Sequence, residues 1–270
     1  MKEVIGFIGA GNMTHVLIEG WLAKNLVPAQ DIIVSNRSPG KLHKLEEQFK
    51  IKTATTNEHV VDSADVVFLA VKPQDLEAAV ENISTSFGEE QLVVSLAAGV
   101  SLRKLKKLLP HCKHLVRVMA NTPAKVMQGS FAYCGNAPHV RTDLFMERMF
   151  SPLGFTLKLD EGEAFEAFTV ASSAGVGFVF ELMIYWQEWL EEHGLEPDTA
   201  QQLTIQTFLG AATLAMKSAP QSLGELQAKV TSKKGVTAAG LDSMRELEIE
   251  RLLRYSFEKS ALRDREIAQD

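Results

Sequence analysis

A glycine-rich turn near the amino end of the chain has the residue types that bind a diphosphate. Gly9, Gly11 and Thr14 stand directly after an apolar run at residues 4–8. Gly9 permits a tight turn, and Gly11 lets the backbone approach a pyrophosphate, which the N–H groups of a following helix would bind. Thr14 departs from the small third residue of such motifs. The turn predicts a dinucleotide site, and the alternative is a glycine turn in a flavodoxin-like or unrelated α/β fold.

The next predicted strand ends in residues that suit a phosphorylated cofactor. Ser35, Asn36 and Arg37 follow the apolar residues 32–34, and no carboxylate stands where an NAD-preferring site usually has one. A guanidinium can form charge-assisted hydrogen bonds to a 2′-phosphate, worth about 1.5–3 kcal/mol. We therefore predict NADPH as the preferred cofactor, with NADH as the second choice. The alternative for Arg37 is a solvated loop residue.

Two later loops are placed to complete that site. Lys72 and Pro73 follow the nearly all-apolar residues 65–71, and Ala98 lies among small residues after the apolar run 92–96. The carboxyl ends of parallel strands line the ligand crevice of an open α/β sheet. We expect Lys72 to face phosphate or ribose, and residues 97–99 to leave room for a flat nicotinamide ring. The alternative for Lys72 is a surface lysine.

The elements that must position these loops alternate along the first part of the chain. Short apolar runs at residues 4–8, 31–35, 65–71, 92–96 and 115–119 are separated by longer stretches, of which 12–24 and 39–49 have a helical pattern. Strands spaced by helices predict βαβ units, a parallel sheet and right-handed crossovers. We predict a doubly wound α/β domain over residues 1–160.

The rest of the chain, residues 161–270, has only helical periodicity. We expect one helix from about residue 178 to 193, a second from residue 197, a third from residue 222 and a last one over 244–262. The first of these is apolar on more than one face, as is typical of a helix inside a large core or against another subunit. We predict an all-helical domain over 161–270 that forms a homodimer.

Composition and charge argue against several other classes of partner. The chain has 28 Lys and Arg against 34 Asp and Glu, a net charge of −6, which disfavours nucleic acid and anionic membranes. We expect every apolar stretch of the chain to be shorter than the roughly 18 residues that a membrane-spanning helix needs. We also expect a cytoplasmic protein. Cys112, Cys134 and the seven scattered histidines offer no ligand cluster or catalytic constellation, so we predict no metal site.

Taken in order, these segments resemble the pyrroline-5-carboxylate reductase family. The matching motifs, spread over residues 4–262, are 9–13 (GAGNM), 35–37 (SNR), 70–74 (AVKPQ), 95–100 (SLAAGV), 117–119 (RVM), 121–123 (NTP) and positions within 231–237. The resemblance implies a Rossmann domain followed by an all-helical dimerisation domain, whose dimers often assemble into larger rings. It also implies reduction of the cyclic imine 1-pyrroline-5-carboxylate to L-proline with NAD(P)H.

The resemblance further implies a role for particular residues. The implied cofactor contacts are Phe7, Ile8, Gly9, Ala10, Gly11, Asn12, Met13, Ser35, Asn36, Arg37, Asn57, Ala70, Val71, Lys72, Pro73 and Ala98. The implied substrate loop, which would hold a small carboxylate at a helix N-terminus, contains Ser232, Gly235, Val236 and Thr237. Thr237 is the implied catalytic residue, whose hydroxyl would orient the imine and help it stay protonated. The alternative for both Asn57 and Thr237 is a helix cap.

The same loop departs from the family pattern. Residues 231–237 read TSKKGVT, so that Lys233 and Lys234 replace a proline and a glycine. We expect this change to alter the path and mobility of the loop. A working reductase is one hypothesis, and a non-catalytic, dinucleotide-binding paralogue of the late-competence type is the other. A β-hydroxyacid dehydrogenase relative would need a catalytic lysine near residues 185–187, which are Tyr-Trp-Gln.

Overall fold

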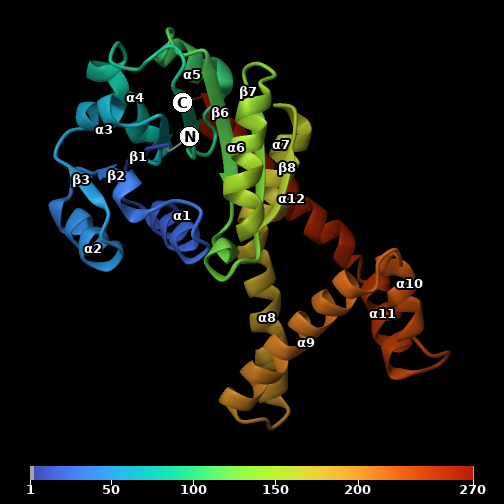
Figure 1. The fold of residues 1–270 in the computed structure, drawn as a ribbon. Helices are drawn as coiled ribbons and strands as arrows, with labels where there is room; N and C mark the ends of the chain where they lie inside the picture. The colour runs from blue at the N-terminus through green and yellow to red at the C-terminus, as the bar shows by residue number, and fades with distance from the viewer. Residues whose placement is uncertain (1–2, 270) are drawn as a thin grey trace. The chain divides into compact units, whose positions relative to one another are not determined.

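The chain folds into two compact units, seen in a computed structural model that describes residues 3–269 (Figure 1). The first unit runs to Ala174 and includes the segment from Ser260 onward, and the second extends from Gly175 to Lys259. The first helix of the region after residue 160, α7 (Glu163–Phe168), groups with the first unit. The domain division at 160/161 stays a prediction.

The first unit is built on an eight-stranded sheet in the order β3-β2-β1-β4-β5-β6-β7-β8. Its parallel part comprises β1 (Ile5–Ile8), β2 (Ile32–Ser35), β3 (Lys52–Ala54), β4 (Val66–Leu69), β5 (Leu92–Ser95) and β6 (His114–Ala120). This order and direction are those of the Rossmann fold, as predicted, and the strand order reverses between β1 and β4. A ligand crevice is therefore expected at the carboxyl ends of these two strands.

Two more strands extend the sheet beyond the predicted parallel series. β7 (Gly129–Gly135) runs antiparallel to β6, and β8 (Gly154–Lys158) runs parallel to β7. A Cβ on Gly154 would lie 1.9 Å from the carbonyl oxygen of Gly129, so only glycine allows this close approach of the two backbones. The complete sheet is therefore mixed. The expected crevice lies in its six-stranded parallel part, β1 to β6.

Helices cover both faces of the sheet (Figure 1). They are α1 (Asn12–Ala23), α2 (Pro39–Phe49), α3 (Asn57–Ser63), α4 (Leu76–Val80), α5 (Leu102–Leu108) and α6 (Val140–Phe150), with short 3₁₀ turns at Ala29–Asp31, Pro73–Asp75, Glu81–Ile83, Thr122–Val126 and Ser151–Leu153. Phe7 and Phe68 pack into the core beneath α1, α2 and α6, while the neighbouring residues Ile8 and Leu69 pack into the core beneath α3, α4 and α5. This alternation explains why the central strands are apolar throughout.

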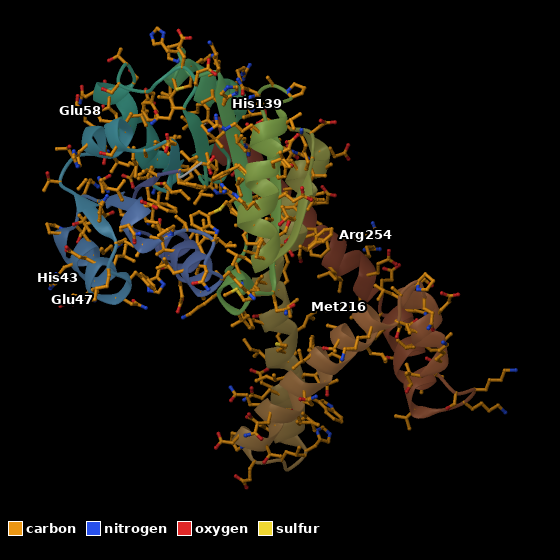
Figure 2. All side chains as sticks on the ribbon, in the orientation of Figure 1. His43, Glu47, Glu58, His139, Met216 and Arg254 are labelled. Carbon is orange, nitrogen blue, oxygen red and sulfur yellow. The ribbon has the colours of Figure 1, made fainter. Side chains whose placement is uncertain are left out.

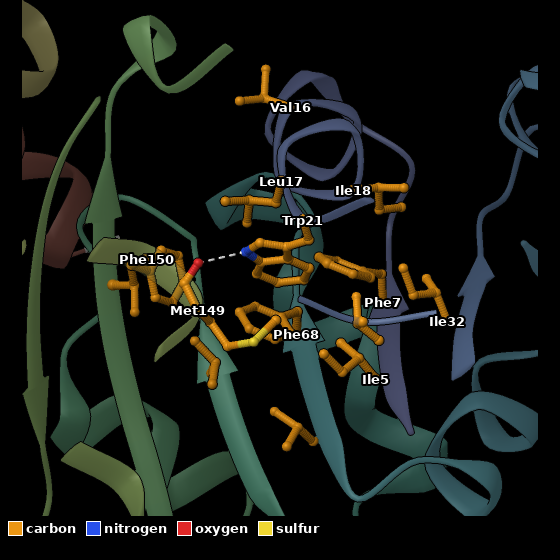
Figure 3. Packing of buried hydrophobic residues seen from close by; sticks show 14 of the residues in the cluster. Ile5, Phe7, Val16, Leu17, Ile18, Trp21, Ile32, Phe68, Met149 and Phe150 are labelled. Carbon is orange, nitrogen blue, oxygen red and sulfur yellow. Dashed lines mark hydrogen bonds between the residues drawn. The ribbon is translucent and has the colours of Figure 1, made fainter. Parts of the chain in front are cut away.

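Aromatic packing anchors α1 to the sheet (Figure 3). The rings of Phe7 and Phe68 stack with their centroids 4.9 Å apart, and Trp21 of α1 packs against both. The indole N–H of Trp21 donates a hydrogen bond of 2.7 Å to the carbonyl oxygen of Met149, so its polar atom is satisfied inside the core. These contacts hold α1 against β1 and β4, the two strands at the reversal point of the sheet.

The remaining elements are helical, as predicted. They are α8 (Gly175–Glu192), which follows α7 through a π-helical turn (Thr169–Ala174), α9 (Pro197–Lys217), α10 (Leu223–Lys229), α11 (Val236–Glu246) and α12 (Ile249–Gln269). The predicted last helix over 244–262 corresponds to α12, but its predicted start was wrong, because residues 244–246 belong to α11. The chain breaks between α11 and α12 because Glu248 adopts a left-handed conformation, with φ of 51°.

Apolar side chains remain exposed along the second unit when the chain is taken alone. Phe180 and Trp189 of α8 are 59% and 58% exposed. Met216 of α9, labelled in Figure 2, is 70% exposed. The helical stretch 163–192 is also long and apolar enough to cross a membrane by length and composition. This corrects the expectation that no such stretch exists, although a single helix of this kind is weak evidence for a membrane segment.

Candidate functional site

The turn between β1 and α1 has the strained, close-packed geometry expected of a phosphate-binding turn. Gly9 has a φ of 113°, and its N–H donates to the carbonyl oxygen of Ser35 over 2.8 Å. A Cβ at Gly9 would lie 2.6 Å from the carbonyl oxygen of Ala70. The hydroxyl of buried Thr14 donates to the carbonyl oxygen of Gly9 over 2.8 Å. Thr14 thus takes the place of the usual third small residue by tying the helix to the turn.

The amino end of α1 carries no side-chain cap. Its N-cap residue is Gly11, and no side chain accepts a hydrogen bond from the first turn. The N–H groups of the first turn of a helix have no partner within that helix, and the helix dipole adds positive potential there. This end of α1 is therefore suited to bind an anion.

A cleft of about 490 Å³ lies at the reversal point of the strand order. The loops that follow β1, β2 and β4 meet there, together with α3 and α4. Its lining residues are Ile8, Gly9, Ala10, Gly11, Asn36, Arg37, Lys41, Asn57, Ala70, Val71, Lys72, Gln74, Asp75, Ala78 and Ala79. The cleft therefore combines the glycine turn, the Arg37 loop and the Lys72 loop in a single site, as their spacing in the sequence predicts.

Charged side chains from the loops after β2 and β4 and from α2 line the cleft. The guanidinium of Arg37 lies 3.2 Å from a carboxylate oxygen of Asp75, and its side chain is 87% exposed. The side-chain oxygen of Asn36 accepts from the N–H of Ala10 over 3.1 Å, which joins the β2 loop to the glycine turn. Lys41 of α2 also lines the cleft. Sequence reasoning missed Lys41 and Asp75, because neither belongs to a recognisable local motif.

Asn57 lies within the cleft and is not the cap of α3. Thr56 caps that helix by accepting from the N–H of His59. The amide of Asn57 instead accepts from the hydroxyl of Ser35 over 2.8 Å and donates to the carbonyl oxygen of Ala79 over 3.0 Å. The cap interpretation of Asn57 was therefore wrong, and its side chain joins β2 to α4 beneath the cleft.

Several predicted cofactor residues lie near the cleft without lining it. The side chain of Phe7 is fully buried, and the partly buried Met13 packs against the same core. Ala98 packs against a different cluster, which contains Phe165. The remaining residues of this group are Ser35, which is buried under Asn57, Asn12, which is exposed at the start of α1, and Pro73, which opens the 3₁₀ turn.

The predicted substrate loop lies in the second unit, between α10 and α11. Gly235 is the N-cap of α11, and its N–H donates to the carbonyl oxygen of Ser232 over 3.0 Å. A Cβ on Gly235 would lie 2.2 Å from the hydroxyl oxygen of Ser232, which can rotate away, and 3.1 Å from the Ser232 carbonyl oxygen, so the turn is tight at this position. Lys234 has a φ of 60°, the conformation that glycine adopts most easily. The loop thus has a glycine-type backbone despite the lysine.

The first turn of α11 is open to a ligand. Val236 is 94% exposed, and Thr237 is also exposed at the second position of the helix. No side chain caps α11, so Thr237 does not serve as the helix cap. Its hydroxyl and the N–H groups of this turn are therefore presented together on the surface of the second unit.

No alternative catalytic group stands out elsewhere in residues 3–269. Within that range no cluster of three or more His, Cys, Asp or Glu could hold a metal ion. Cys112 and Cys134 are free and buried, and burial raises their pKa values to about 11 and about 12. Both thiols therefore stay protonated at neutral pH and are poor nucleophiles.

Two family descriptions match separate parts of the chain. NADP oxidoreductase coenzyme F420-dependent matches residues 4–99, and pyrroline-5-carboxylate reductase dimerisation matches residues 162–267. The first match contains all residues that line the cleft. The second contains the exposed apolar helices and the loop that leads into α11.

Relatives match the chain over nearly its full length. The pyrroline-5-carboxylate reductase of Pseudomonas aeruginosa is 35% identical and covers 98% of this chain and 97% of its own. The Arabidopsis thaliana protein of that name is 31% identical, with 98% and 95% covered. The solved pyrroline-5-carboxylate reductase of Coxiella burnetii has a TM-score of 0.90 at 31% identity and covers 99% of both chains. Since sequence and fold agree across both units, the chain belongs to the pyrroline-5-carboxylate reductase family.

Proposed function

We propose that this protein reduces the cyclic imine 1-pyrroline-5-carboxylate to L-proline by hydride transfer from NADPH. The observation that carries the proposal is the cleft at the reversal point of the sheet, with the uncapped end of α1 at one side and Arg37 at another. Its shape and charge suit a dinucleotide, and full-length relatives named pyrroline-5-carboxylate reductase point to the substrate.

The residues of the cleft fit the cofactor in distinct ways. Gly9 and Gly11 keep side chains away from the diphosphate, which the first turn of α1 binds. Arg37 and Lys41 supply positive charge for the 2′-phosphate, and the amide of Asn57 fixes the wall between β2 and α4. When bound, the nicotinamide supplies the hydride.

The proposed substrate site is the loop before α11. The open N–H groups of its first turn suit a small carboxylate, and Thr237 would place its hydroxyl by the imine nitrogen, keeping the imine oriented and protonated. An imine of this kind can take its proton from water, so positioning is the main catalytic contribution asked of the chain. Ser232, Gly235 and Val236 complete this proposed loop.

We also propose a cytoplasmic homodimer, with a ring of dimers as a larger assembly. The exposed apolar side chains of α8 and α9 have the character of an interface, because contiguous apolar surface on a soluble chain is normally covered by a partner. The match of residues 162–267 to a dimerisation family supports a second copy of this chain as the partner.

The alternative, a non-catalytic paralogue of the late-competence type, is not favoured. It drew its support from Lys233 and Lys234, which replace the family's proline and glycine. Lys234 nevertheless adopts the positive φ of a glycine, and Gly235 remains at the N-cap of α11. The turn that presents the α11 amino end is therefore retained.

Turnover measurements test the proposed function directly. The full chain is incubated with NADPH and 1-pyrroline-5-carboxylate, and both NADPH absorbance and L-proline are followed. We expect substrate-dependent NADPH oxidation with one proline formed per NADPH. Stoichiometric NADPH binding with no proline would instead support the paralogue. Activity gained by replacing Lys233-Lys234 with Pro-Gly would then place the fault in this loop.

Cofactor preference gives a separate prediction about Arg37. Arg37→Ala should lower the ratio of the NADH to the NADPH dissociation constant by about tenfold, because one charge-assisted hydrogen bond to an exposed phosphate is lost. The two dissociation constants are measured by nucleotide fluorescence titration. Arg103→Ala, a change in a basic residue of α5 outside the cleft, is the control and should leave the ratio unchanged. An unchanged ratio in Arg37→Ala would refute the 2′-phosphate assignment.

A further inference from the structure

A carboxylate lies in the part of the cleft assigned to the 2′ position of the cofactor. Asp75 ends the 3₁₀ turn that follows β4, and its side chain is 32% exposed. One of its oxygens lies 3.2 Å from a guanidinium nitrogen of Arg37, which follows β2. The acid that is missing from the end of β2 is therefore supplied by another loop.

Asp75 differs in charge from the other ionisable residues of the cleft. Among the described residues that line the cleft, Arg37, Lys41 and Lys72 are basic, and Asp75 is the one carboxylate. A guanidinium has five N–H donors, so the contact with Asp75 leaves Arg37 donors for a phosphate. The carboxylate of Asp75 and a 2′-phosphate would then both contact the guanidinium of Arg37, and the two anions would lie close together.

We propose that Asp75 limits the discrimination of this cleft between NADPH and NADH. Its carboxylate repels the 2′-phosphate of NADPH and competes with it for Arg37, while it can accept a hydrogen bond from the 2′-hydroxyl of NADH. This inference rests on the cofactor assignment of the proposed function. It assigns Asp75, a residue outside the recognisable motifs, as a specificity determinant.

Asp75 also has an opposing effect, because it holds Arg37 in place for the phosphate. Ion pairs between exposed side chains are weak, and Arg37 is 87% exposed, so this preorganisation is small. A phosphate monoester carries about 1.5 to 2 negative charges at neutral pH, so its repulsion by Asp75 is larger. We therefore expect removal of the carboxylate charge to strengthen NADPH binding.

The test is Asp75→Asn, which preserves shape and removes the charge. Dissociation constants of NADPH and NADH are measured by fluorescence titration on the full chain at low salt. We expect the ratio of the NADH to the NADPH constant to rise about tenfold. The rise should shrink in about 0.3 M salt, since the screening length falls below the roughly 10 Å found at 0.1 M. Thermal unfolding without nucleotide checks that the variant folds normally.

Two further variants sharpen the test. Glu77→Gln removes an exposed charge from α4 that does not line the cleft, and should leave the ratio at its parental value. Asp75→Ser removes the charge without adding an amide, and should raise the ratio as Asp75→Asn does. If the ratio of the NADH to the NADPH dissociation constant is unchanged or lower in both Asp75 variants, the proposal is overturned.

The Arg37→Ala result separates this failure from that of the cofactor assignment. If Arg37→Ala lowers the ratio and the Asp75 variants do not raise it, the Asp75 proposal alone is refuted. If Arg37→Ala leaves the ratio unchanged, the phosphate is not bound at this end of the cleft. The assignment of the 2′ position and the role of Asp75 are then refuted together.

Discussion

Gly9→Ala is expected to reduce NADPH affinity by about a hundredfold and to destabilise the fold by about 2 kcal/mol. The native φ of 113° is unfavourable for alanine, and the new Cβ would lie 2.6 Å from the carbonyl oxygen of Ala70. That oxygen belongs to the backbone of a second cleft loop and cannot rotate away as a side chain would. The turn and the loop must therefore move apart, which displaces the N–H groups that face the diphosphate.

Two glycine variants separate the effect on binding from the effect on folding. A Cβ on Gly11 would lie 3.7 Å from the nearest atom, so Gly11→Ala should keep its stability but lose NADPH affinity where a methyl meets the diphosphate. Gly88 lies in a loop outside the cleft, and Gly88→Ala should change neither property. Titration with NADPH and denaturant unfolding measure the two effects. Parental affinity in Gly9→Ala would show that the diphosphate does not bind at this turn.

Elements defined by local chemistry were predictable from the sequence. The predicted helix 39–49 matches α2 because Pro39 supplies the fixed φ of a first helical turn. Strands β7 and β8 were not predicted, since β8 is half-exposed and depends on the contact between Gly154 and the backbone of Gly129. The break at Glu248 has no sequence signal, because a glutamate rarely adopts a positive φ.

The residues of the candidate site also fall into those that the local sequence predicts and those that only the structure reveals. Gly9, Asn36 and Arg37 were predictable because each follows directly from a strand end, where a parallel sheet places its ligand loops. Lys41 and Asp75 lie outside the motifs recognised in the sequence, and their meeting at the cleft is seen only in the structure. No sequence spacing encodes that meeting, so the residues that tune cofactor preference required the structure.

Thr237→Val is the variant with the largest expected effect on turnover. Valine keeps the shape of threonine and removes the hydroxyl, which we propose donates to or orients the imine nitrogen. Loss of one such positioned group typically costs about 10²-fold in kcat. Because Thr237 is exposed and does not cap α11, stability and NADPH affinity should stay at parental values. Steady-state kinetics with 1-pyrroline-5-carboxylate, with NADPH titration and thermal unfolding, measure these quantities.

Thr237→Ser supplies the matched control, because it restores a hydroxyl at the same carbon. We expect it to recover most of the parental kcat, whereas an effect caused by lost packing would not be rescued, since serine lacks the threonine methyl group. A kcat of Thr237→Val within about twofold of the parent would remove Thr237 from the proposed chemistry. In that case the open N–H groups at the start of α11 would position the substrate without it, and the imine would take its proton from water alone.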